Sequence, residues 1–180
     1  MLPDLGDTVC VLAMLLPPNV PKDIQESVVE VVVPYVSFEG VLCEGPLIVH
    51  AELAHEVVDI FKTLAKQKFP IEKIRPLHLY DWDDERSMQD NNTSAFNYRV
   101  ILFTDRLSNH SYGRALDINP RLNPYLAYDK NIYPQGATYD ASVPGTITKD
   151  DMVVSLFKSH GWSWGGDWET VKDYQHFEKL

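Results

Sequence analysis

Two residues with metal-binding side chains lie close together in the segment SNHSYGRALDIN, at positions 108–119. His110 and Asp117 are seven positions apart, with Gly113 and Ala115 between them. Zinc favours imidazole nitrogen and carboxylate oxygen, and a catalytic zinc site has three protein ligands and an open position. A turn at Gly113 would aim both side chains at one ion and leave room for a substrate backbone. By itself such a pair arises more often by chance, for example in a surface turn that leads into a strand.

A third metal ligand has to come from elsewhere in the chain. His176 is the best candidate, because it lies in KDYQHFE with Asp173 three positions before it. A carboxylate that lies beside a metal-bound histidine without being a ligand suits the deprotonation of a metal-bound water. Asp173 fits this role, although the same spacing also occurs at solvated helix ends. The other histidines have simpler interpretations as surface or structural residues: His50, His55, His78 and His160.

Composition limits the class of protein. The chain has 180 residues, of which 44% are hydrophobic and 23% charged, and this balance predicts one soluble globular domain. A net charge of −10 without a Lys/Arg cluster disfavours a nucleic-acid-binding protein. No apolar run is long enough to span a membrane. Cys10 and Cys43 are not in a CxxC pair, so a cysteine-type zinc site is not expected.

Hydrophobic patterns predict an irregular mixture of strands and helices, which favours the α+β class. The β-branched and aromatic segment 27–38 predicts a strand, and apolar spacing over 51–68 predicts a helix that ends before Pro70. Further strands are expected over 74–82, 95–103 and 115–118.

The remaining segments are less regular. Residues 121–145, rich in Pro, Tyr and Asn, predict a long loop. A helix is expected through Met152 and Phe157, with Thr148 or Asp150 as its cap and Gly161 at its end. The apolar segment 9–18 predicts a first strand or a docked helix. It lacks the preceding basic residues of a secretory signal.

Three segments together resemble the M15 zinc peptidases, which include the D-alanyl-D-alanine carboxypeptidases. SNHSYGRALDIN matches the signature S-x-H-x-x-G-x-A-x-D, GWSWGGDWETVKDYQHFE is similar to the C-terminal segment of the family, and NNTSAFNYR is similar to the upstream segment of its VanY-like branch. The resemblance implies an α+β fold of the Hedgehog/DD-peptidase type, with a small antiparallel sheet and helices packed on one side. We expect one domain over 1–180, with a strand-and-helix part at 1–70 and the motifs within 80–178.

The resemblance also implies roles for particular residues. His110, Asp117 and His176 would bind Zn²⁺, and Asp173 would be the general base, where many relatives carry Glu. Arg99 would stabilise the developing oxyanion or grip a substrate carboxylate, with Arg86 and Arg106 as alternatives. The expected substrate contacts are Tyr98, Ser108, Tyr112 and Trp164. A hydrogen-bond partner for a ligand histidine is expected from Asp167, Ser108 or Asn109.

The C-terminal tryptophans Trp162, Trp164 and Trp168 have two interpretations, core packing or one wall of the substrate cleft. The implied activity is zinc-dependent hydrolysis of peptidoglycan stem peptides, with a C-terminal D-alanine as the first substrate to test. An endopeptidase of the L-alanyl-D-glutamate type is the alternative within the enzyme class. A non-catalytic zinc module of the same fold would need a fourth ligand, from His160 or Asp167. We expect a monomer that acts in the cell envelope, the periplasm or outside the cell.

Overall fold

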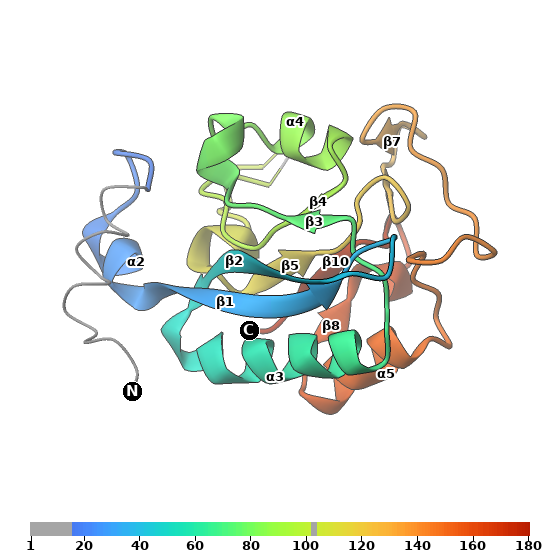
Figure 1. The fold of residues 1–180 in the computed structure, drawn as a ribbon. Coiled ribbons are helices and arrows are strands. Elements are labelled where there is room, and N and C mark those ends of the chain that lie inside the picture. Colours follow the sequence, from blue (N-terminus) through green and yellow to red (C-terminus); the bar gives the residue numbers. More distant parts are fainter. Residues whose placement is uncertain (1–15, 102–103) are drawn as a thin grey trace.

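The computed structural model describes residues 16–101 and 104–180, which form a mixture of short helices and strands (Figure 1). This mixture confirms the α+β class. In chain order the elements are α2 (Lys22–Ser27), β1 (Val28–Val36), β2 (Leu42–His50), η1 (Ala51–Leu53), α3 (Ala54–Lys66), β3 (Lys73–Ile74), η2 (Leu77–Tyr80), α4 (Asp84–Gln89), β4 (Asn92–Thr93), η3 (Asn109–Tyr112), β5 (Ala115–Asp117), β6 (Tyr125–Leu126), β7 (Ile132–Tyr133), α5 (Met152–Ser159), β8 (Ser163–Trp164), η4 (Gly165–Asp167), β9 (Lys172–Asp173) and β10 (His176–Glu178).

The strands of the described part form four small sheets, where one had been expected. The antiparallel hairpin β1–β2 is the longest, and the other sheets have the orders β5-β10-β8, β7-β6-β9 and β3-β4. Among the described strands, only β3 and β4 pair in parallel. Most of these strands have two or three residues, so they depend on tertiary packing for their stability.

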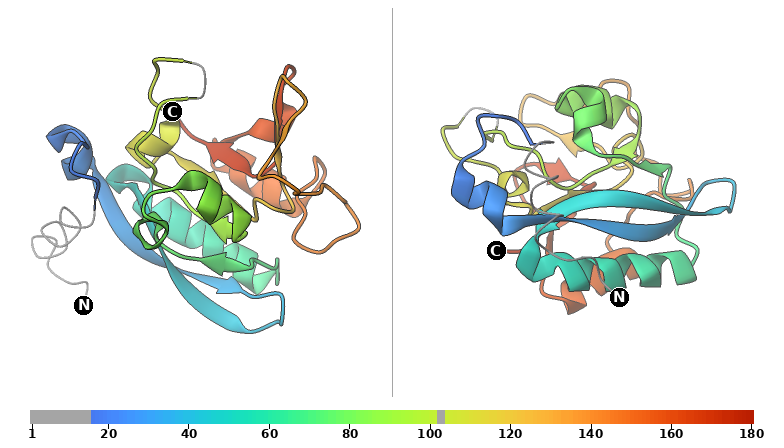
Figure 2. Two further views of the ribbon diagram at one scale, coloured as in Figure 1. Left: turned by 90° about the horizontal axis from the view of Figure 1, so that it is seen from above. Right: turned by 60° about the vertical axis from the view of Figure 1, so that its left-hand side comes forward.

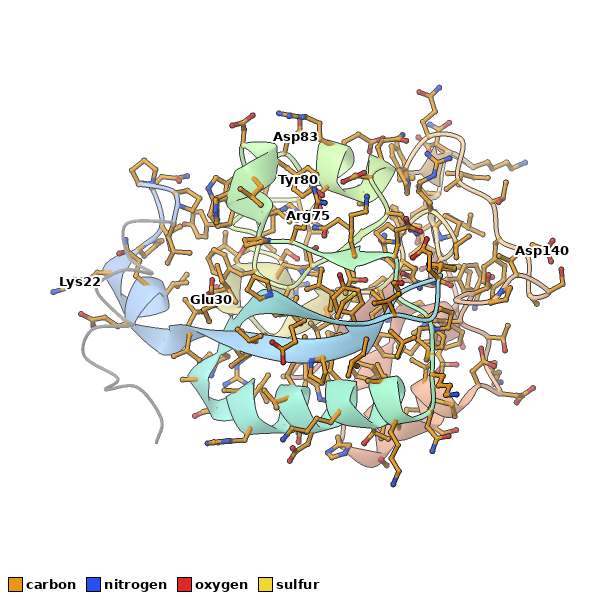
Figure 3. The ribbon with its side chains drawn as sticks, in the orientation of Figure 1. Lys22, Glu30, Arg75, Tyr80, Asp83 and Asp140 are labelled. Carbon is orange, nitrogen blue, oxygen red and sulfur yellow. The ribbon has the colours of Figure 1, made fainter. Side chains whose placement is uncertain are left out.

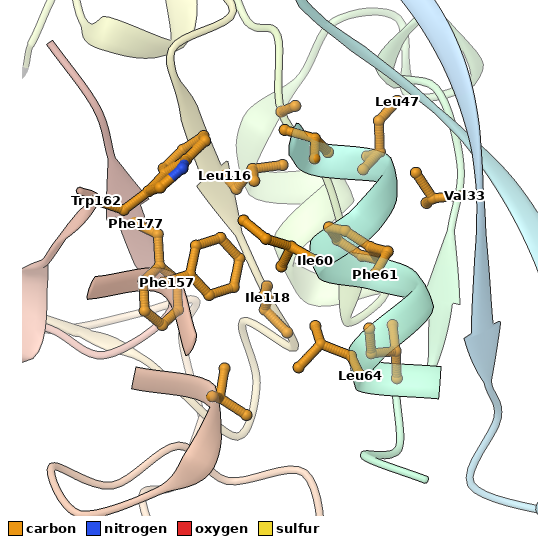
Figure 4. Close-up of a cluster of buried hydrophobic side chains, with 14 of the residues drawn as sticks. Val33, Leu47, Ile60, Phe61, Leu64, Leu116, Ile118, Phe157, Trp162 and Phe177 are labelled. Carbon is orange, nitrogen blue, oxygen red and sulfur yellow. The ribbon is translucent and has the colours of Figure 1, made fainter. Parts of the chain in front are cut away.

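Helix α3 lies between the hairpin and the sheet that contains β5 and β10, so helices do not pack on one side of a single sheet (Figure 4). Phe61 faces Val33 and Leu47 of the hairpin, whereas Ile60 faces Leu116 and Ile118. All six side chains are almost fully buried. One hydrophobic core therefore joins the first and second halves of the chain.

Three predicted elements occur close to their expected positions. The strand predicted over 27–38 is β1, the helix predicted over 51–68 consists of η1 and α3, and the short strand predicted over 115–118 is β5. The predicted helix near residue 152 is α5, but Asp151 occupies its cap position in place of Thr148 or Asp150. Gly161 follows the end of α5 with a φ of 82°. Residues 9–15 of the apolar segment 9–18 lie outside the described residues.

The strand predicted over 74–82 is wrong beyond Ile74, because the chain forms the turn η2 there. Leu77 and Tyr80 are buried, but Leu79 is 60% exposed. Burial at every third position fits a 3₁₀ turn and not a strand. Tyr80 lies between α4 and β3 (Figure 3), where its hydroxyl donates to Asp90 at 2.6 Å.

The strand predicted over 95–103 is also wrong within the described residues. The backbone N–H of Asn97 donates to the carbonyl of His110, and the N–H of Arg99 donates to the Ser111 hydroxyl. These partners belong to η3, which is not a strand, so no ladder forms. The only bridge described in this segment pairs Val100 with Leu107.

The C-terminal end of β10 is tied to the first turn of α3. Lys179 Nζ donates to both carboxylate oxygens of Glu56 at 2.9 Å, and Trp162 Nε1 donates to one of them at 2.7 Å. These contacts join residues that are more than a hundred positions apart.

Within the described residues, no helix is long and apolar enough to cross a membrane.

Gly113 follows η3 in the chain and packs against the end of β2. Its φ is 64°, and its carbonyl accepts a hydrogen bond from the N–H of His50 at 2.9 Å. A Cβ atom added to Gly113 would lie 2.5 Å from the His50 nitrogen. The space that the sequence suggested for a metal and substrate is therefore filled by the end of β2.

We predict that Gly113→Ala lowers the free energy of unfolding more than Gly40→Ala does. Both glycines have a positive φ, but a Cβ at Gly40 would meet nothing within 4 Å. Gly40→Ala should cost about 1–2 kcal/mol for the left-handed backbone, and Gly113→Ala about 1–3 kcal/mol more for the clash. Urea unfolding of both variants measures the difference. Equal losses would show that the close approach at Gly113 is unimportant.

Candidate metal centre

Three segments meet to bring His110, Asp117 and His176 together. Asp117 ends β5 and His176 begins β10, and the antiparallel pairing of these strands sets the two residues directly opposite each other. The turn η3 supplies His110 from the segment just before β5. The backbone of Asp117 is fixed further by two hydrogen bonds with Ser94, at 2.9 and 3.0 Å. The predicted ligands thus converge, and they are the one group of metal-binding side chains found among the described residues.

The three side chains face one another at short distances. His110 Nε2 lies 3.2 Å from Asp117 Oδ2 and 3.2 Å from His176 Nδ1, and His176 Nδ1 lies 3.0 Å from Asp117 Oδ1. The ligand atoms of a tetrahedral zinc site with bonds of 2.0–2.1 Å are separated by about 3.3–3.4 Å. The three atoms are therefore close to the spacing that such an ion requires. All three residues are buried, with exposed fractions of 2%, 4% and 6%.

Each histidine is oriented by a hydrogen bond on its other nitrogen. His110 Nδ1 donates to the carbonyl of Ala95, which leaves Nε2 as the electron-pair donor toward the centre. His176 Nε2 lies 3.1 Å from a carboxylate oxygen of Glu178, and Asn109 Nδ2 donates to the same oxygen at 2.6 Å. A carboxylate or carbonyl in this position fixes the tautomer of a metal-binding histidine.

The charges of the three residues suit a cation. Burial alone would raise the pKa of Asp117, but His110 and His176 reverse this effect and hold its pKa well below the usual range. Burial would lower the pKa of His176, but hydrogen bonds to Asp117 and Glu178 raise it to about 10. The cluster therefore favours a positive charge between its members, and this charge can be a proton or a metal ion. The two nitrogens and one carboxylate fit a divalent metal.

Asp173 lies in β9, three residues before His176, and its Oδ1 is buried without a hydrogen-bond partner among the described residues. Burial raises the pKa of Asp173 to about 7, with His176 opposing the rise and Asp117 adding to it. A Cβ atom added to Gly165 would lie 2.6 Å from the Asp173 carbonyl oxygen. Gly165 therefore allows η4 to pack directly against the backbone of Asp173.

Arg99 is held beside α4. Its Nε lies 3.1 Å from Asp84 Oδ2, although the two groups are not aligned as a hydrogen bond. The Arg99 side chain is partly exposed. Arg86, one of the two alternatives, forms an ion pair with Asp81 at 2.6 Å on the surface.

The expected substrate contacts have different environments. Ser108 is buried and accepts a hydrogen bond from the N–H of His110, so it caps η3. Trp164 is 2% exposed and donates from Nε1 to the carbonyl of Tyr174 at 2.9 Å, so the structure places it in the core. Neither side chain is free to contact a substrate. Tyr112 is 37% exposed, and Tyr98 is partly buried against a second apolar cluster.

Three further residues expected near the metal have other roles or partners. Asp167 pairs with Lys158 Nζ at 2.6 Å, and His160 Nδ1 lies 3.6 Å from Glu56. Neither one therefore joins the cluster or orients a ligand histidine. Asn109 acts indirectly, through its hydrogen bond to Glu178.

Two neighbours of His176 were missed from the sequence. Glu178 could have been found, because residues two apart in a strand point to the same face. Trp168 packs against His176 with ring centroids 5.4 Å apart. Nothing in the sequence distinguished Trp168 from the two buried tryptophans Trp162 and Trp164.

We predict that Glu178→Gln weakens the binding of Zn²⁺ by about 10- to 100-fold. The amide is a weaker acceptor than the carboxylate, and its NH₂ group can favour the wrong tautomer of His176. Glu52→Gln is a matched control, because Glu52 also lies near a histidine, 3.6 Å from His50. Competition with a chelator measures both affinities. The same affinity in both variants would contradict an orienting role for Glu178.

The affinity for Zn²⁺ should rise with pH, because a metal must displace the proton that His176 carries below its pKa of about 10. Displacement of one proton gives about a tenfold gain per pH unit. Chelator competition at pH 6, 7 and 8, corrected for protonation of the chelator, measures this slope. A flat profile would contradict the exchange of a proton for the metal.

Comparison with known proteins agrees with this geometry. Residues 103–179 match an M15 peptidase family model described as D-alanyl-D-alanine carboxypeptidase. No solved structure matches the chain. The matched segment contains all three residues of the cluster and also Asp173. Residues 103–179 of this chain are therefore similar to the M15 peptidases.

Proposed function

We propose that this protein is a zinc-dependent peptidase that hydrolyses peptidoglycan stem peptides. The observation that carries the proposal is the buried cluster of His110, Asp117 and His176, within a segment that matches a peptidase family. Catalytic zinc sites have three protein ligands, whereas structural sites are closed by four. Among the described residues, no fourth side chain of a metal-binding type completes the cluster. This ligand number supports a catalytic centre over a non-catalytic zinc module.

Zinc is the metal that this set of ligands suits best. Imidazole nitrogens and one carboxylate oxygen in a tetrahedral arrangement are typical of zinc, whereas magnesium and calcium prefer oxygen ligands alone. When bound, zinc lowers the pKa of a coordinated water and polarises the substrate carbonyl. The buried histidines would hold the ion rigidly, because Ala95 and Glu178 fix both rings.

Asp173 would act as the general base. Its pKa of about 7 is close to the value at which a group both accepts and donates protons efficiently. Its free Oδ1 can accept a proton from the attacking water and pass it to the leaving amine. A non-catalytic zinc module would have no need for such a carboxylate.

Arg99 remains the candidate for binding negative charge. Its guanidinium is partly exposed, and its contact with Asp84 leaves other N–H groups to donate. It can stabilise the oxyanion that forms at the substrate carbonyl, or it can bind a terminal carboxylate.

A C-terminal D-alanine is the first leaving group to test, in line with the description of the matched family. An internal bond of the stem peptide is the second candidate, and the side chains beside Asp173 favour it. Because peptidoglycan lies outside the cytoplasmic membrane, we propose that the protein acts in the cell envelope or outside the cell.

The test of this function is digestion of stem peptides by the zinc-loaded protein. We predict that Asp173→Asn keeps one zinc per chain but lowers kcat by about 10²- to 10⁴-fold, because the proton of the attacking water loses its acceptor. Asp167→Asn is the matched control from the same segment, since Asp167 pairs with Lys158 at the surface. Mass spectrometry of the products gives rates and cleaved bonds.

Two outcomes would count against these assignments. Full activity of the Asp173→Asn protein would remove Asp173 as the base. If the zinc-loaded wild-type protein cleaved no stem peptide, the proposed function itself would be wrong.

A further inference from the structure

Two tyrosines continue from Asp173 across a small sheet. Tyr125 in β6 lies directly opposite Asp173 in β9 and directly opposite Tyr133 in β7. Residues that are directly opposite in antiparallel strands point to the same face. Asp173, Tyr125 and Tyr133 therefore form one row across three strands. Figure 2 shows these segments as a narrow projection at one side of the molecule.

The row is about 10 Å long, because neighbouring strands are about 4.8 Å apart. The rings of Tyr125 and Tyr133 are stacked, with centroids 6.2 Å apart and an angle of 28°. Both tyrosines are partly exposed. The row therefore offers an aromatic surface that begins at the candidate base.

The phenol of Tyr125 is a hydrogen-bond donor in a negative environment. Burial raises its pKa, and the carboxylates of Asp173 and Asp129 raise it further. The hydroxyl thus stays protonated and can donate to a peptide carbonyl. The same two carboxylates repel a free terminal carboxylate, which is the group that a single leaving D-alanine would carry.

The position of Asp173 determines which side of the substrate the row can meet. In the proposed reaction Asp173 gives its proton to the leaving amine, so that amine must lie within hydrogen-bond reach of Asp173. The substrate residues that follow the amine therefore begin beside Asp173. The two tyrosines lie next to this starting point.

We propose that Tyr125 and Tyr133 form a subsite for the leaving side of the substrate, and that the leaving peptide continues beyond one residue. The inference rests on the proposed function and chooses between its two substrate classes, in favour of an internal bond. One residue spans about 3.5 Å of extended chain, so a single D-alanine beside Asp173 cannot reach Tyr133. A leaving peptide of three residues spans the row.

A pair of synthetic peptides tests this proposal. Both share the acyl side of a stem peptide; one releases a single D-alanine, and the other releases an amidated tripeptide. We expect the zinc-loaded protein to cleave the longer peptide with a kcat/KM at least about tenfold higher. Tyr133→Ala should reduce this preference by about three- to tenfold, mainly through KM, because stacking on the ring is lost.

Two further variants distinguish the contribution of the Tyr133 ring from general effects on the β6–β7 hairpin. Tyr133→Phe keeps the aromatic ring and should keep the preference. Ile132→Ala changes the neighbouring residue of β7, which points to the opposite face and is 43% exposed, and it should change nothing. A wild-type preference for the shorter peptide, or equal effects of Tyr133→Ala and Ile132→Ala, would overturn the subsite while leaving the peptidase function intact.

A binding measurement does not depend on turnover. A calorimetric titration with the amidated tripeptide should show binding to the wild-type protein. Binding to Tyr133→Ala should be about three- to tenfold weaker. Ile132→Ala should bind as the wild type does. No binding to the wild type, or the same affinity in all variants, would overturn the subsite even if the protein proved not to be a peptidase.

Discussion

The pairing of β5 with β10 is the constraint on which the candidate metal centre depends. It sets Asp117 opposite His176, with both side chains on one face. A shift of one residue would turn His176 away and bring Phe177 into its place. Phe177 prevents this shift, because it is fully buried and stacks on Phe157 with centroids 4.1 Å apart. The hydrophobic core thus determines which residues of β10 face the candidate metal centre.

Irregular backbone contributes as much to the site as the strands do. The segment after β4 is not a strand, and this leaves the carbonyl of Ala95 free to accept from His110. Had this segment joined a ladder, that carbonyl would have been used in strand pairing. The proposed base also depends on a local exception, because only a glycine at position 165 allows η4 to approach Asp173 so closely.

The sequence was sufficient to predict that three side chains converge, because the motifs that resemble the M15 peptidases contain these residues in order. His110, Asp117 and His176 converge as expected. The prediction of a strand after Ile74 was wrong, because alternating apolar residues also fit a turn in which every third residue is buried. Tyr125 was not found, because β6 has two residues and such a strand has no periodic pattern. Its position depends on pairing with β9, nearly fifty residues later.

The placement of α3 has a consequence for how mutations act on the protein. The residues that match the peptidase family fill only one side of the core, and α3 and the hairpin β1–β2 fill the other. The motif-bearing segment therefore cannot form a complete hydrophobic core by itself. It cannot be transplanted to another protein without α3 and the hairpin β1–β2. A change at Phe61, more than a hundred positions before His176, alters the support of the strands β5 and β10 while leaving every motif intact. Loss of the proposed activity in a variant with intact motifs could then originate in α3, outside the segment that matches the family.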